Sequence, residues 1–255
     1  MNILSKVIAI SSLAKTLLIA MFFIASSRYT IVAQEFDFDT RMREYNMIDV
    51  QELDPEILVE LKYSTVDNFV GKDMYGDLEC AYLEKEFANR VVKAQRILKQ
   101  RNPNYTLLIY DAARPISTQR AMRKIVEGTE LERFVADGKR GGRHNYGVAV
   151  DLTIATLDGK PLDMGAGFDD FSNAASVKGT ADTSDPKTRT IDIYRQYVND
   201  LVSNEIITKA AAQNRILLLE VMCEAGLYPY RREWWHYEDI MPMDSVHLKY
   251  KLLNF

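Results

Sequence analysis

Histidine is the first place to look for chemistry, because the 255-residue chain contains only three: His144, His236 and His247. His144 is followed seven positions later by Asp151, which lies in an otherwise apolar stretch. An acid on an apolar strand is costly to bury unless something compensates its charge. The His-x6-Asp pattern could therefore supply a pair of metal ligands, but by itself it is weak evidence and better fits a salt-bridged acid and a surface histidine.

A second group of candidates lies in the segment Glu233-Trp234-Trp235-His236-Tyr237. Its aromatic side chains predict a wall that excludes water, and the polar residues within it need partners. Read alone, the segment also fits a core histidine bonded to backbone and flanked by an exposed acid. Together with His144 and Asp151, however, His236 supplies a third ligand suited to zinc and leaves the fourth position open, as in catalytic sites. Glu233 could then accept a proton from water and return it to a leaving amine.

Arg114 belongs to the segment Asp111-Ala112-Ala113-Arg114-Pro115, which follows a short apolar run at 106–110. The run predicts a buried strand, so Arg114 lies at a strand end. A guanidinium there could stabilise the oxyanion of a tetrahedral intermediate. Pro115 restricts the backbone of Arg114 to extended conformations. The alternative reading is a loop arginine in an ordinary salt bridge.

These three segments resemble the signatures of the zinc D-alanyl-D-alanine dipeptidases, which belong to the wider group of zinc D-Ala-D-Ala carboxypeptidases. The resemblance extends over most of residues 50–240 in the family's order. Its segments are 110–115, 143–153 and 233–236, with 62–71 and 164–169 as further matches. The last two narrow the resemblance from the wider group to the dipeptidases.

The resemblance implies hydrolysis of a small dipeptide substrate, D-alanyl-D-alanine, to two D-alanines. It assigns one zinc ion per chain to three ligands: His144, Asp151 and His236. It makes Glu233 the general base and acid, Arg114 the residue that stabilises the transition state, and Asp169 the acid that holds the substrate's ammonium group. A carboxylate fixed in a small pocket favours that cation and disfavours longer peptides, whose nitrogen is a neutral amide.

One position departs from the family pattern. Some members carry serine two residues before the first histidine, where it contacts substrate, whereas this chain has Gly142. Related activities stay open: a zinc D,D-carboxypeptidase, or an L-Ala-D-Glu endopeptidase, acting on peptidoglycan stem peptides. A zinc-containing binding module without catalysis is a further alternative, but it would be expected to lack Glu233 and Arg114, and both are present.

The elements that must position these residues are predicted from periodicity and turn signals. Helices are expected at 84–100, 117–126, 191–202 and 209–225, and strands at 57–63, 106–110, 148–154, 227–230 and 234–237. In the third strand, Asp151 shares a face with the small residues Ala149 and Thr153, which leaves room for a ligand. Glu233 must begin the last strand if it is to share a site with His236. The mixture predicts an α+β fold, a single domain with a small, mainly antiparallel sheet packed against helices.

Residues 1–33 predict a signal peptide, because they combine basic residues, a short apolar centre and no acid. The dipeptidase domain is then 34–255, periplasmic or secreted, with no stable membrane anchor after cleavage. Export would favour recycling of dipeptides from the cell wall over removal of a cytoplasmic precursor. The net charge of −4 gives no basic footprint for nucleic acid. An oxidising compartment would permit a Cys80–Cys223 disulfide, but two separate buried thiols fit the sequence as well.

Overall fold

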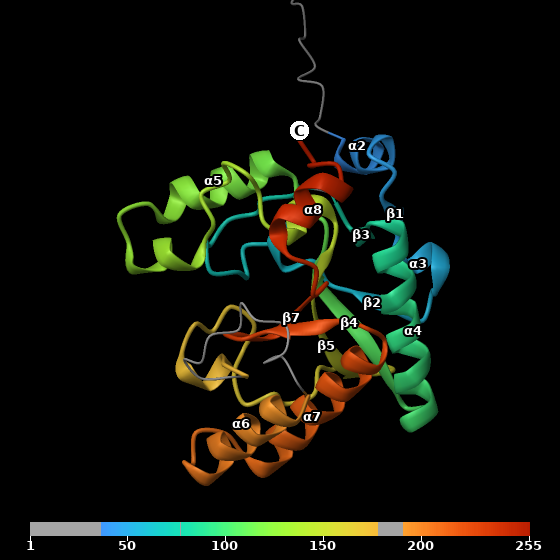
Figure 1. Cartoon of the computed structure of the whole chain (residues 1–255), viewed down its shortest axis with the longest axis vertical. Coiled ribbons are helices and arrows are strands. Elements are labelled where there is room, and N and C mark those ends of the chain that lie inside the picture. Colours follow the sequence, from blue (N-terminus) through green and yellow to red (C-terminus); the bar gives the residue numbers. More distant parts are fainter. Residues whose placement is uncertain (1–36, 77, 178–190) are drawn as a thin grey trace, which may run out of the picture. The chain divides into compact units, whose positions relative to one another are not determined.

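A five-stranded sheet lies at the centre of the computed structural model, which describes residues 37–76, 78–177 and 191–255 (Figure 1). Its strands, in spatial order, are β2 (Leu58–Val59), β4 (Tyr105–Asp111), β5 (Ala149–Thr156), β7 (Glu233–Glu238) and β6 (Tyr228–Tyr230). Only β2 and β4 pair in parallel within this sheet. Residues 38–255 form one compact unit, so the prediction of a single α+β domain with a mainly antiparallel sheet is confirmed. The predicted signal peptide at 1–33 lies outside the described residues.

Two long helices pack against each other and against the sheet (Figure 1). Helix α4 (Lys85–Arg101) lies on β4, and α7 (Lys209–Glu224) lies on β5 and β6. Helix α4 forms because its apolar side chains recur at helical spacing and are buried, and because the Glu84 carboxylate accepts the Phe87 N–H at its start. Helix α6 (Ile191–Ser203) packs on α7 as a further layer.

The remaining elements are short. They are α2 (Phe38–Glu44), α3 (Val50–Leu53), α5 (Ile116–Val126), α8 (Met243–Lys249) and a two-stranded sheet of β1 (Ile48–Asp49) and β3 (Tyr82–Leu83). Helix α5 begins at Ile116, directly after Pro115 and one residue before the predicted helix at 117–126. The carboxyl end of the chain lies beside α2, where the rings of Tyr45 and Phe255 are 5.1 Å apart (Figure 1). Within the described ranges, every helix is too short or too polar to cross a bilayer.

The two faces of the sheet have different neighbours. Side chains of β4 and β5 that alternate onto one face, such as Leu107 and Leu152, join the main core with α4 and α7. The opposite face carries Leu108 and Tyr110, which pack with Phe168 from the loop after β5. Strand pairing places Leu108 opposite Thr153, so Asp151 lies on this second face, away from the two helices.

One predicted strand is wrong in most of its length. Only Leu58–Val59 of the segment 57–63 pairs with the sheet, and Lys62–Ser64 form a 3-10 turn instead. The turn buries the Tyr63 side chain, which is 2% exposed, beneath the second face of the sheet. An alternation of apolar residues cannot distinguish a strand from a strand followed by such a turn, because the turn buries Leu61 and Tyr63 as a strand would.

The two cysteines are separate thiols. Cys80 and Cys223 are both partly buried and free, which agrees with the second of the two readings that the sequence allowed. Burial raises the pKa of the Cys223 thiol to about 12, so it is a poor nucleophile at neutral pH.

Candidate metal centre and active site

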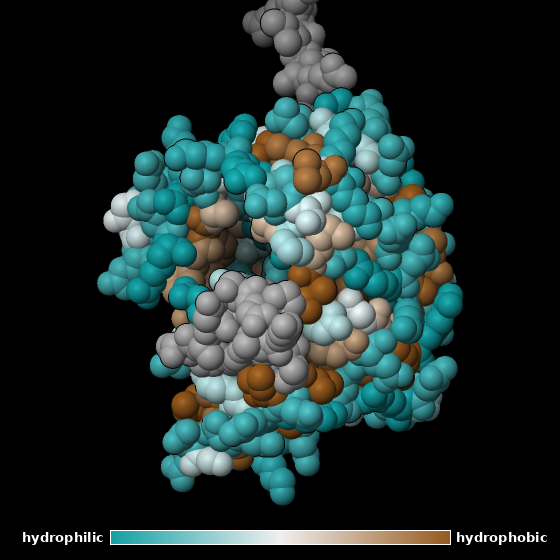
Figure 2. All heavy atoms as spheres, viewed as in Figure 1, coloured by the Kyte–Doolittle hydropathy of each residue, from teal (hydrophilic) through white to brown (hydrophobic). Residues whose placement is uncertain are grey.

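The six predicted site residues line one cavity of about 420 Å³ on the second face of the sheet. They are Arg114, His144, Asp151, Asp169, Glu233 and His236. The face of the molecule seen in Figure 2 is mostly hydrophilic and is hollowed below helix α5. Aromatic side chains line the same cavity, among them Phe69, Phe171 and Trp235, so its polar groups lie in surroundings that limit access of water.

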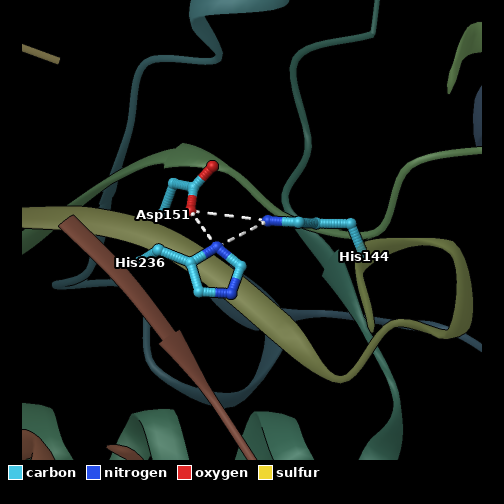
Figure 3. Close-up of side chains that lie close together, drawn as sticks. All are labelled: His144, Asp151 and His236. Carbon is cyan, nitrogen blue, oxygen red and sulfur yellow. Dashed lines mark hydrogen bonds and ion pairs between the residues drawn. The ribbon is translucent and has the colours of Figure 1, made fainter. Parts of the chain in front are cut away.

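Three side chains converge at the centre of this cavity (Figure 3). His144 Nε2 lies 3.4 Å from Asp151 Oδ1, and His236 Nδ1 lies 2.9 Å from the same oxygen. The two imidazole nitrogens are 3.2 Å apart. In a tetrahedral zinc site, ligand atoms lie about 3.3 Å from one another, which follows from the usual zinc–ligand bond lengths. The donor types and spacings fit such a cation.

In each imidazole, the nitrogen that faces away from Asp151 has its own hydrogen-bond partner. That partner determines whether the nitrogen facing Asp151 carries a lone pair. His144 Nδ1 lies 2.7 Å from the Ala112 carbonyl oxygen, which can only accept, so Nδ1 donates. His236 Nε2 lies 3.2 Å from the Glu238 carboxylate and donates to it. When both rings are neutral, each therefore directs a lone pair at the Asp151 carboxylate. Three acceptors in contact require a positive charge between them, and the group is therefore one that could hold a metal ion.

The pKa values of this group follow from the same contacts. Burial favours the neutral acid at Asp151, but the two imidazoles outweigh it and hold the pKa of Asp151 well below its usual range. Burial also disfavours imidazolium at His236, yet hydrogen bonds to Asp151 and Glu238 raise its pKa to about 10. A proton on His236 thus compensates the acids around it, and a bound cation would replace that proton.

Local structure explains how the three side chains reach one point. Residues 143–146 form a 3-10 turn that ends at Gly147, whose φ of 68° reverses the chain into β5. Asp151 and His236 are directly opposite each other in the pairing of β5 with β7. The turn and the register together bring His144, from outside the sheet, over two residues within it.

Glu233 is the first residue of β7, as sharing a site with His236 requires. Its pairing with Tyr230 is irregular, and this shift at the strand start lets a residue three positions before His236 approach the same group. Glu233 Oε2 lies 3.8 Å from His236 Nδ1. Burial raises the pKa of Glu233 to about 7, with nearby charges modifying it, so the carboxyl is suited to gain and lose a proton near neutrality.

Arg114 is held at the cavity wall by Asp111, an acid whose role no sequence motif indicates. Asp111 is fully buried and pairs with the Arg114 guanidinium, whose Nε lies 3.1 Å from Asp111 Oδ2. Tyr75 donates to the other oxygen of Asp111 at 2.7 Å, and Gln119 accepts from Arg114 Nη1 at 2.9 Å. A bulge in β4 aligns Asp111 with Asp151 rather than leaving it one residue further along. The alignment brings Arg114 to the cavity.

Asp169 lines the same cavity and has a left-handed backbone, with φ of 59°. The Tyr63 hydroxyl lies 3.1 Å from each of its carboxylate oxygens. Burial, reinforced by the negative charge of Asp151, raises the pKa of Asp169 well above its usual range. An ammonium group arriving beside Asp169 would stabilise its ionised form. Such strained conformations in non-glycine residues are frequent at ligand sites.

Several polar residues of the site were missed from sequence, and the signals for them were weak. Glu238 is two positions after His236 and therefore shares its face of the strand, which is a usable signal. Tyr63 and Tyr75 carry no local pattern that indicates their bonds to Asp169 and Asp111. His247, in contrast, lies on α8 beside Arg140 and is not part of the cavity lining.

A buried group that could hold a metal ion, with a carboxylate beside it and an arginine in the same cavity, is typical of a hydrolase site. A family model agrees: peptidase M15, described as D-Ala-D-Ala dipeptidase, matches residues 43–191 and 200–252. The chain therefore belongs to the peptidase M15 family and is a peptidase.

Individual relatives carry the same description. The chain is 29% identical over 192 residues to the D-alanyl-D-alanine dipeptidase of Escherichia coli K12, covering 75% of this chain and 83% of that protein. It is 26% identical to the D-alanyl-D-alanine dipeptidase of Synechocystis sp., covering 78% and 88%. It is 28% identical to that of Enterococcus faecium, covering 70% and 83%. The resemblance that the sequence motifs suggested is therefore confirmed.

Proposed function

We propose that this protein hydrolyses D-alanyl-D-alanine to two D-alanines with one zinc ion held by His144, Asp151 and His236. The observation that carries the proposal is the convergence of these three ligand atoms, all within 4.8 Å of one another, with Glu233 beside them. The names of the relatives support the choice of substrate. When bound, zinc supplies a positive centre that polarises the scissile carbonyl and acidifies water.

In the proposed reaction, Glu233 and Arg114 have separate roles. Glu233 accepts a proton from the attacking water and delivers it to the leaving amine, for which a pKa of about 7 suits it. Arg114, fixed by Asp111, stabilises the negative charge that develops on the carbonyl oxygen. The aromatic wall excludes bulk water and strengthens both interactions.

Specificity for a dipeptide comes from Asp169. Its carboxylate pairs with the free ammonium group of the substrate, and Tyr63 holds it in place. A substrate with an acylated amine offers no charge there, and leaves the Asp169 carboxyl buried without an ionic partner. The site should therefore reject the N-acylated stem peptides that a carboxypeptidase of the wider group accepts.

The experiment compares two substrates on zinc-loaded protein. We expect release of D-alanine from D-Ala-D-Ala and a rate lower by at least about 10²-fold for N-acetyl-D-Ala-D-Ala, because a lost charged hydrogen bond and a buried unpaired group together cost about 3 kcal/mol. Turnover of the acetylated compound at an equal rate would instead indicate a D,D-carboxypeptidase. Cleavage of an L-Ala-D-Glu peptide alone would indicate the endopeptidase, and zinc binding without any turnover a binding module.

We also propose that the protein acts outside the cytoplasm and recycles dipeptides released from the cell wall. The basic and apolar character of residues 1–33 supports export. We expect the protein to bind a small dipeptide, and to bind neither nucleic acid nor, once the signal peptide is cleaved, the membrane. Fractionation of cells and N-terminal sequencing of the mature protein test this. Activity confined to the cytoplasm, with residues 1–33 retained, would contradict it.

A further inference from the structure

The two imidazoles of the metal-ligand group have outer partners of different kinds. His144 donates to a backbone carbonyl, that of Ala112, at 2.7 Å. His236 instead donates to a carboxylate, Glu238 Oε2, at 3.2 Å. A carboxylate acceptor fixes the ring orientation and makes the opposite ring nitrogen a stronger donor to a metal. Glu238 therefore affects the orientation and the metal affinity of the His236 ring more strongly than a neutral carbonyl would.

The position of Glu238 follows from the strand register. It is the last residue of β7, two positions after His236, and both side chains lie on the same face of the sheet. Its partner on β5 is Ala149, whose small side chain leaves the space that the Glu238 carboxylate occupies. Glu238 is only 6% exposed, so its negative charge needs compensation.

Arg143 supplies that compensation. Its Nε lies 2.9 Å from Glu238 Oε2, and the two side chains are 10% and 8% exposed. Arg143 directly precedes His144 in the 3-10 turn. The ion pair therefore joins the turn that carries one predicted ligand to the strand that carries another, and holds both at the distance the metal group requires.

We propose that Glu238 is a positioning residue of the metal centre, which orients His236 so that Nδ1 faces the cation, and that Arg143 fixes Glu238 in this role. The proposal rests on the zinc site proposed above. The new element is Glu238, which is not one of the three ligand residues and acts through its bond to His236. Removal of such an outer partner costs about 10- to 100-fold in metal affinity.

The neighbouring residue provides a matched control. Asp239 forms a comparable ion pair with Arg90, with 2.6 Å between Arg90 Nη2 and Asp239 Oδ2 and side chains 27% and 13% exposed. Asp239 also accepts the Met241 N–H. Loss of this pair removes a partly buried carboxylate one residue from Glu238 without altering the acceptor of His236. It should affect stability and leave metal affinity unchanged.

The test measures the zinc dissociation constant of the purified full chain by competition with a chromogenic chelator. We expect Glu238→Ala to weaken zinc binding about 10- to 100-fold, Glu238→Gln to weaken it less, and Asp239→Asn to leave it within about twofold of wild type. The absorption spectrum of the Co²⁺-loaded protein should shift in both Glu238 variants, because the geometry at His236 changes, and stay unchanged in Asp239→Asn.

Circular dichroism of the metal-free variants establishes that each is folded, and the isosteric Glu238→Gln carries the test if Glu238→Ala is not. Wild-type zinc affinity and an unaltered Co²⁺ spectrum in a folded Glu238 variant would overturn the proposal. Equal weakening in Asp239→Asn would also overturn it, since the effect would then be one of general stability. Wild-type protein that binds no zinc would refute the proposed function itself, a result distinct from these two.

Discussion

At the residue scale, the site depends on charges that are buried because each has a partner. Asp111 illustrates this, since a fully buried carboxylate would be unfavourable without the Arg114 guanidinium and the Tyr75 hydroxyl. The same contacts aim Arg114 into the cavity. Removal of Asp111 would leave an uncompensated arginine charge as well as a misplaced side chain, so stability and catalysis are coupled at this position.

Asp169 gives the clearest prediction for a single side chain. We expect Asp169→Asn to lower kcat/KM for D-Ala-D-Ala by about 10- to 100-fold, mainly through KM, because the charge-assisted bond to the substrate ammonium is lost. The neighbouring acid Asp170, whose carboxylate accepts the Ser172 N–H in the same loop, is the control. Asp170→Asn should leave kcat/KM nearly unchanged. Steady-state kinetics of the two variants measure the difference. Equal effects, or a loss in kcat alone, would contradict the role given to Asp169.

The residues that belong to a recognisable sequence motif were predictable from sequence. The residues that hydrogen-bond to them were not. His144, Asp151, Glu233 and His236 were singled out because metal chemistry demands those types at those spacings, and the structure brings them together. Tyr63 supports Asp169 and Glu238 supports His236. Their contacts depend on packing between elements, which no local spacing encodes.

At the element scale, the site is built from a turn, a bulge and a strand register. The turn that ends at Gly147 places His144 in the cavity, and the bulge in β4 places Asp111 and Arg114 there. The pairing of β5 with β7 aligns Asp151 with His236. A slip of one residue in that pairing would move Asp151 and its partner to opposite faces and destroy the group. Each device is a local backbone feature with a defined consequence for a functional side chain.

Substitution of Gly147 tests whether the turn requires a residue without a side chain. Its φ of 68° disfavours any side chain, and an added Cβ would lie 2.6 Å from Met47 Sδ and 2.9 Å from the Glu84 backbone nitrogen. We expect Gly147→Ala to lower the free energy of unfolding by about 2–4 kcal/mol, from backbone strain together with crowding. Urea unfolding followed by circular dichroism measures the change.

Gly71 is a matched control for strain alone, because its φ is 65° and an added Cβ would meet nothing within 4 Å. Gly71→Ala should lower the free energy of unfolding by only about 1 kcal/mol. Equal losses in the two alanine variants would show that crowding at Gly147 is absent and that the turn tolerates a side chain.

Long periodic elements were predictable, and short ones were not. Helix α4 was expected at 84–100 and spans Lys85–Arg101, because apolar residues at helical spacing over many positions are a strong signal. The segment 57–63 was misread as one strand because only two of its residues find a partner strand. The order of strands in the sheet stayed open, since pairing of β4 with β5 and of β5 with β7 joins segments far apart in the chain.

At the scale of the whole molecule, the proposed cation joins three separate parts of the fold. Its ligands come from the 3-10 turn, from β5 and from β7, and burial of Asp151 beside two imidazoles leaves a negative group that a cation would stabilise. Metal binding and folding should therefore be linked, because the unfolded chain has no such site.

The linkage predicts a metal-dependent melting temperature. With free zinc at about 100 times its dissociation constant, the folded state should gain about 2.7 kcal/mol, which raises Tm by about 5–10 °C in a domain of this size. Differential scanning calorimetry with and without a chelator measures the shift. The same titration on His144→Ala should give little or no shift, and a full shift in that variant would place the metal elsewhere.

The proposed hydrolysis depends on proton transfer by Glu233 beside a zinc ion that Glu233 does not itself hold. The most direct measurement is therefore zinc content and D-Ala-D-Ala turnover of Glu233→Ala beside wild type. We predict one zinc per chain in both proteins and a kcat lower by about 10²- to 10⁴-fold in the variant. A variant that retains wild-type turnover, or that loses its zinc together with its activity, would contradict this account.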